Sequence, residues 1–69
     1  MNVDAVMALA VKHLGSGMES SARVALADAV ELRDAYKYED ARNRALRSLQ
    51  YSVGVFHPDY QRAARGVPV

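Results

Sequence analysis

The sequence predicts an all-α fold, a small bundle made of a helical hairpin, a third helix and a tail. Apolar residues recur at intervals of three and four along most of the chain, which is the period of an amphipathic α-helix. No pair of strand-like segments is evident, and no linker is long enough to separate two domains. We therefore expect a single helical domain over residues 1–66 and a frayed tail over residues 67–69.

The first expected helix begins after Asn2 and ends before Gly15. Asn2 is a residue type that caps helix N-termini, and Asp4 suits the positive end of the helix dipole. Ser16 and Glu19 then have the spacing of a capping box, which predicts that a second helix begins directly after this turn. The apolar positions of the first helix are Val3, Val6, Met7, Ala10, Val11 and Leu14.

The second helix, from about Gly17 to about Tyr36, carries a stripe of mostly small residues that we call the alanine seam. Small side chains let another backbone approach closely. A chain of 69 residues hides only about 60% of its unfolded surface, and this chain has no cysteine to form a disulfide. We therefore expect a homodimer to complete the core through the seam. The seam consists of Met18, Ala22, Ala25, Ala29 and Leu32, followed by Tyr36.

The third helix is expected from about Glu39 to about Phe56. A break before it rests on a change of apolar phase, because residues 36–40 contain no glycine or proline, and one continuous helix is the alternative. Residues 51–56 around Gly54 also have strand propensity, which leaves an extended segment open. Pro58 opens a short last turn that Gly66 stops. The apolar face consists of Tyr38, Ala41, Ala45, Leu49, Val53 and Phe56.

The charged residues show one local bias, a group of arginines at positions 42, 44 and 47. Nine basic and eight acidic residues leave a formal net charge of +1, so no overall field attracts a polyanion. Glu39 and Asp40 precede Arg42 and Arg44 at pairing distances, which favours a solvated helix face. A small nucleic-acid-binding surface is the alternative function. It would consist of Arg42, Arg44, Arg47, Arg62 and Arg65, with Tyr51 and Tyr60 as stacking faces.

The leading functional hypothesis is a non-catalytic protein that binds another protein, as an adaptor or an inhibitor. Tyrosine and arginine are enriched at interfaces, and we expect five of them to anchor a partner: Tyr36, Tyr38, Arg42, Arg47 and Tyr51. The serines lack a nearby histidine and a glycine-flanked elbow, so nothing indicates a nucleophile. Asp28, near the edge of the seam, is the carboxylate to examine, and a small enzyme with a site between two chains ranks third.

No metal or cofactor is expected. Thiolate ligands are absent, and His13 and His57 lie far apart in the sequence with no partner at ligand spacing. Residues 1–14 are apolar, yet Asp4 stands where a signal segment has positive charge, and the run is too short to span a bilayer. We expect a cytoplasmic protein with no membrane partner.

Two short resemblances remain. His57-Pro58-Asp59, after a segment that carries arginines, resembles the tripeptide with which J-domain cochaperones stimulate a chaperone ATPase. In that family another long helix follows the tripeptide. Here only ten residues follow it, beginning with Tyr60, so we carry over neither fold nor activity. Residues 38–41 resemble half of a tetratricopeptide-like hairpin, a fold that stacked repeats stabilise and of which this chain has room for one hairpin.

Overall fold

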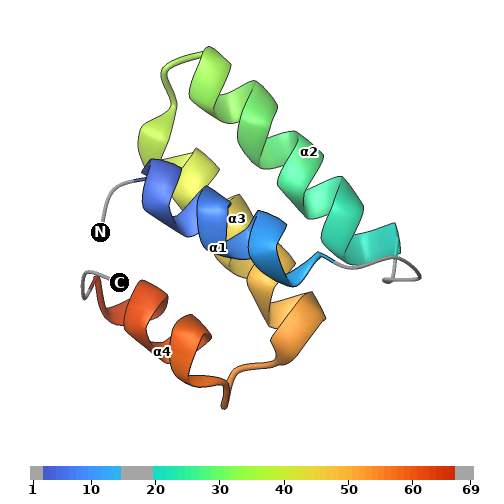
Figure 1. Ribbon diagram of the computed structural model, residues 1–69. Coiled ribbons are helices and arrows are strands. Elements are labelled where there is room, and N and C mark those ends of the chain that lie inside the picture. Colours follow the sequence, from blue (N-terminus) through green and yellow to red (C-terminus); the bar gives the residue numbers. More distant parts are fainter. Residues whose placement is uncertain (1–2, 15–19, 67–69) are drawn as a thin grey trace.

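The protein consists of four α-helices in a computed structural model that describes residues 3–14 and 20–66 (Figure 1). They are α1 (Val3–His13), α2 (Ser20–Asp34), α3 (Tyr38–Val53) and α4 (Pro58–Arg65). The predicted all-α class is confirmed, and the described ranges contain no strand. The fourth element exceeds the expected short turn, since it forms eight residues of regular helix. The expected capping box at residues 16–19 lies outside the described residues.

Helices α2 and α3 form a closely packed hairpin, which is the most extensive contact in the molecule. Ala22, Ala25 and Ala29 of the alanine seam are buried against α3, whose Ala41 and Ala45 are also buried. The seam therefore packs within one chain, and the dimer contact expected there is not available on these alanines. Leu32 is only half-buried, and Met18 lies outside the described residues. A homodimer remains a prediction, and it would need another surface.

The hairpin also contains one buried polar contact between its two helices. The Ser48 hydroxyl is completely buried and donates a hydrogen bond of 2.8 Å to the Ala22 backbone oxygen. A hydroxyl is tolerated at such a position because its hydrogen-bonding capacity is satisfied. The contact requires the two backbones to lie close together, which the small residues of the seam permit.

The turn between α2 and α3 confirms the predicted break and explains it. Tyr36 has φ +63°, the left-handed conformation that ends many helices and that glycine adopts most easily. The Tyr36 amide donates to the Arg33 oxygen and the Lys37 amide to the Leu32 oxygen, both at 2.9 Å. These are the two hydrogen bonds of a Schellman motif, here with tyrosine in the usual glycine position. The last residue of the expected apolar stripe is consequently solvated, with Tyr36 79% exposed.

The core is thin, as the chain length predicts. Helix α1 packs mainly on α3 and less on α2, and Figure 1 shows it lying across the hairpin. Leu49 and Val6 are the only large apolar side chains that are completely buried among the described residues. All four helices contribute to the central cluster, which contains Val6, Met7, Leu9, Ala29, Ala45, Leu49 and Ala63.

Helix α3 ends at Val53, three residues before the predicted end. Gly54 has φ +86°, a conformation that side chains rarely adopt, and it takes the chain out of the helix. Phe56, expected on the apolar face of the third helix, is 88% exposed in the turn that follows. The extended alternative for residues 51–56 is also wrong, because Tyr51–Val53 is helical and residues 55–56 form a turn.

Helix α4 begins and ends as its sequence predicts. His57 is extended, as a residue before proline should be, and Pro58 occupies the first turn. Gly66 ends the helix in the left-handed conformation. In the part of the chain that the structure describes, no helix is both long and apolar enough to cross a membrane.

Candidate functional site: the groove between α2 and α3

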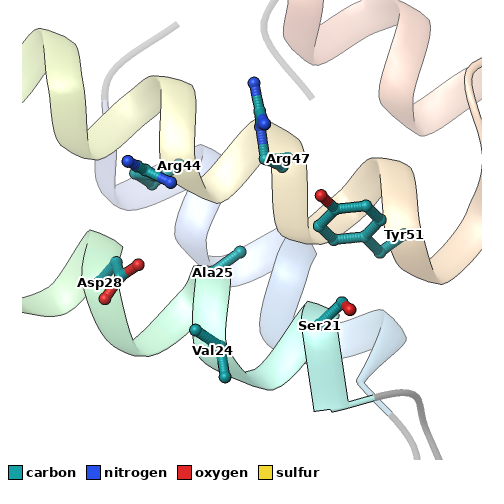
Figure 2. A pocket seen from close by; sticks show the side chains of 7 residues that line it. All are labelled: Ser21, Val24, Ala25, Asp28, Arg44, Arg47 and Tyr51. Atoms are coloured by element: carbon teal, nitrogen blue, oxygen red, sulfur yellow. The ribbon is translucent and has the colours of Figure 1, made fainter.

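An open groove of about 260 Å³ runs between α2 and α3 on the outer side of the hairpin (Figure 2). Figure 2 shows the side chains of one helix along each edge, with the arginines and the tyrosine coming from α3. We call it the α2–α3 groove. Its lining residues are Ser21, Val24, Ala25, Asp28, Arg44, Arg47 and Tyr51.

Helical spacing places these residues on the same side of the hairpin. Positions 44, 47 and 51 are three and four apart, so they follow one face of α3, and positions 21, 24, 25 and 28 do the same on α2. Ala25 is nearly completely buried, whereas Val24 beside it is 59% exposed. The seam alanine thus lies low in the groove and Val24 lies on its rim.

The groove combines apolar surface with charges that have no partner. Val24 and Tyr51, the latter 42% exposed, supply the apolar part. Over residues 3–14 and 20–66, neither Arg44 nor Arg47 forms an ion pair or a side-chain hydrogen bond. Asp28 is half-buried and brings one carboxylate to the opposite edge. Arginine side chains without partners in the free protein are available to an incoming group.

A second hollow of about 280 Å³ adjoins the groove along the same pair of helices. It shares Asp28 and Arg44 with the first and adds Glu31 and Leu32. The accessible surface between the helices therefore extends from Ser21 to Leu32 along α2, about 17 Å of helix at 1.5 Å per residue. That length suits a peptide segment better than a small molecule.

The five residues expected to bind a partner do not form one patch. Arg47 and Tyr51 line the groove, as does Asp28, the carboxylate singled out for examination. Tyr36 and Tyr38 lie at the α2–α3 turn, where their rings meet edge to face at 6.2 Å. From Tyr38 to Tyr51 is about 20 Å along α3.

Arg42, the fifth expected anchor, has an internal role. Its guanidinium donates hydrogen bonds to the backbone oxygens of Ala63 at 3.0 Å and Ala64 at 3.4 Å. These carbonyls belong to the last turn of α4, where helices have unpaired acceptors and favour positive charge. Arg42 therefore holds α4 to α3 and is not free for a partner.

The arginines expected to form one basic surface are divided between two sides. Arg44 and Arg47 line the groove, Arg42 contacts the end of α4, and Arg62 and Arg65 lie on α4 itself. The ion pairs expected at positions 39 with 42 and 40 with 44 are not among those formed by the described residues. Arg62 instead lies 3.9 Å from the Asp59 carboxylate.

Sequence reasoning missed Ser21 and Val24 as site residues. Val24 is an apolar residue on the side of the second helix away from the alanine seam. An apolar residue in such a place is the signal that could have identified it. The position of Ser21 depends on which face of α2 meets α3, and no motif in the sequence marks it.

A second group of polar side chains lies outside the groove, between α1 and α4. We call His13, His57 and Asp59 the His–His–Asp cluster. His13 Nε2 lies 2.8 Å from Asp59 Oδ2, and the rings of His13 and His57 approach edge to face at 5.0 Å. The two histidines that were expected to lie apart are therefore neighbours, because the fold returns α4 to the end of α1.

The local chemistry of the His–His–Asp cluster follows from helix capping. His57 is the N-cap of α4, and its Nδ1 accepts a hydrogen bond of 3.0 Å from the Asp59 amide. The hydrogen bond from His13 lowers the pKa of the Asp59 carboxyl, and the positive charge of Lys12 acts in the same direction. Asp59 is consequently ionised at neutral pH. The tripeptide that resembles the J-domain motif forms a helix cap in this fold.

No family model matches the chain, and neither the curated proteins nor the solved structures include a match.

Proposed function

We propose that this chain is a non-catalytic protein-binding module, an adaptor or inhibitor, that holds a segment of another protein in the α2–α3 groove. The observation that carries the proposal is a pair of arginines, Arg44 and Arg47, that have no ion pair or side-chain hydrogen bond among the described residues and lie beside exposed Val24 and Tyr51. An apolar surface next to tyrosine and arginine is the composition that protein interfaces favour.

The charges of the groove indicate the chemistry of the segment that would bind there. In the groove two guanidinium groups on the α3 edge face one carboxylate, Asp28, on the α2 edge, and Glu31 adds a second carboxylate in the adjoining hollow. A complementary segment carries an aspartate or glutamate toward Arg44 and Arg47 and places an apolar side chain against Val24. The segment that fits beside Arg44 and Arg47 is therefore one that carries an acidic residue next to an apolar one.

Nucleic acid is the weaker candidate. A polyanion needs several cations along one continuous path, and the arginines of this chain lie on separate sides of the molecule. Asp28 and Glu31 also place carboxylates along the surface where a phosphate backbone would follow the two available arginines.

A peptide-display selection on the immobilised protein tests the proposal. We expect enriched peptides to share an acidic residue next to an apolar one, and to lose at least about tenfold in affinity for the charge-reversed variant Arg47→Glu. Arg65→Glu is the matched control, because it reverses an exposed arginine on α4, outside the groove. It should leave peptide affinity unchanged.

Two results would contradict the proposal. One is a selection whose peptides bind Arg47→Glu as well as the original chain. The other is tight binding of single- or double-stranded DNA that falls steeply with added salt and disappears in Arg47→Glu, which would make the groove a nucleic-acid surface.

A further inference from the structure

The His–His–Asp cluster brings together ligand groups from opposite ends of the chain. His13 is the last residue of α1, His57 caps α4, and Asp59 lies in the first turn of α4. One ligand atom from each residue lies within 4.8 Å of the other two. All three residues are partly buried, with the His13 side chain 19% and the Asp59 side chain 18% exposed.

We propose that the His–His–Asp cluster binds a divalent transition-metal ion of the zinc class and thereby fastens α4 to α1. Two imidazoles and one carboxylate are a ligand set that suits such ions, with solvent completing the coordination. The residue types exclude a soft thiolate site, and a single carboxylate is too few oxygens for calcium.

The distances are close to those that a metal requires. Zinc bonds to imidazole nitrogen and carboxylate oxygen are about 2.1 Å, so two ligand atoms on one tetrahedral ion lie about 3.4 Å apart. All three ligand atoms lie within 4.8 Å of one another, so a metal would draw any two of them together by at most about 1.4 Å. Side-chain rotation alone supplies a movement of this size, with no change in the helices.

Metal binding would replace one or two hydrogen bonds. When His13 donates to Asp59 from Nε2, that nitrogen carries a proton, so metal binding there requires the proton to move to Nδ1 and leave the Nε2 lone pair free. The Nδ1 lone pair of His57 accepts from the Asp59 amide, so this cap is given up if the ring binds the metal through Nδ1 and kept if it binds through Nε2. Lys12 and Arg62 also place positive charge near the carboxylate. These costs indicate weaker binding than that of preformed zinc sites.

The location gives the site a structural purpose. Small domains without disulfides commonly depend on a metal or a partner for stability, and this chain has no cysteine. Helix α4 has one fully buried side chain, Ala63, so a bond between its first turn and α1 would hold the helix where apolar contacts are few.

The test is titration of the untagged chain with Zn²⁺, followed by calorimetry and by thermal unfolding with and without EDTA. At about 100 times the dissociation constant we expect the melting temperature to rise on the order of 10 °C, and EDTA to reverse the rise. Co²⁺ should produce visible d–d absorption that Zn²⁺ abolishes.

Two variants separate metal binding from the hydrogen-bonded cluster seen in the structure. His13→Gln keeps a donor for Asp59, and His57→Asn keeps an oxygen that caps α4, so both should fold as judged by circular dichroism. Each should weaken Zn²⁺ binding at least about tenfold. Asp34→Asn, at an exposed carboxylate on α2, is the control and should bind Zn²⁺ like the original chain.

Three results would overturn the proposal. They are the absence of Zn²⁺ binding at millimolar concentration, equal binding by His13→Gln and His57→Asn, and loss of binding in Asp34→Asn. The first two would show that the cluster joins α4 to α1 by hydrogen bonds alone.

Discussion

In the α2–α3 hairpin the two helices touch along rows of buried alanines, whereas α4 is held mainly by polar side chains. The hairpin buries five alanines and the Ser48 hydroxyl between its helices. Helix α4 buries only Ala63, and its other attachments are Tyr60 packed on the core, the Arg42 hydrogen bonds and the His13–Asp59 contact.

The two regions should therefore lose stability for different reasons. Close helix packing depends on the volume of side chains, so an added methyl group disturbs it although no specific bond is lost. A helix held by a few polar contacts tolerates changes of volume but loosens when a donor is removed. Three pairs of substitutions test these two behaviours.

Ala29→Leu should disrupt the packing between α2 and α3. Ala29 is completely buried in the central cluster, and a leucine there must push α2 and α3 apart. We expect the free energy of unfolding to fall by about 2–3 kcal/mol, which is a decrease of roughly 10–20 °C in melting temperature for a domain of this size. Thermal and urea denaturation followed by circular dichroism measure both quantities.

Ala27→Leu is the matched control, because Ala27 lies on the exposed side of the same helix. It should change the free energy of unfolding by less than about 0.5 kcal/mol. If the two variants were equally stable, the close contact between α2 and α3 would be wrong.

Arg42→Met should loosen α4 and leave the hairpin unchanged. Methionine keeps the apolar part of the side chain but removes the donors that reach the Ala63 and Ala64 oxygens. Since the site is partly exposed, we expect a loss of about 1 kcal/mol, mainly as faster amide hydrogen exchange in α4. Exchange in α2 and α3 should be unaffected.

Arg44→Met provides the comparison for that experiment, since Arg44 faces the groove and makes no contact with α4 among the interactions of the described residues. Its α4 amides should exchange at the original rate. Equal acceleration in both variants would show that helix charge, and not the two hydrogen bonds, holds α4.

Tyr36→Gly should stabilise the hairpin by removing its one strained residue. Tyr36 has φ +63° and is well exposed, so a glycine relieves the strain and loses only the edge-to-face ring contact with Tyr38. We expect the free energy of unfolding to rise by about 0.5 kcal/mol, a small increase in melting temperature. Lys37→Gly, at φ −93°, should give no such gain, and a gain there instead would contradict the assignment of strain to Tyr36.

Parts of the candidate site were predictable and parts were not. The sequence indicated tyrosine and arginine as binding residues, and Arg47 and Tyr51 do line the groove. It did not indicate that Arg42 turns toward α4, because a cap on another helix depends on which helix end lies nearby. The His–His–Asp cluster was missed for the same reason, since 46 residues separate His13 from Asp59.

The sequence alone determined the all-α class, the approximate C-terminal end of α1 and the ends of α4, because helix periodicity, caps and proline act on neighbouring residues, and it left the break near Tyr36 open against one continuous helix. Only the tertiary structure decided that the alanine seam packs within one chain, since a stripe of small residues is complementary to any helix that reaches it. The groove and the His–His–Asp cluster arise at places where distant segments meet, and such meetings depend on the packing of all four helices together.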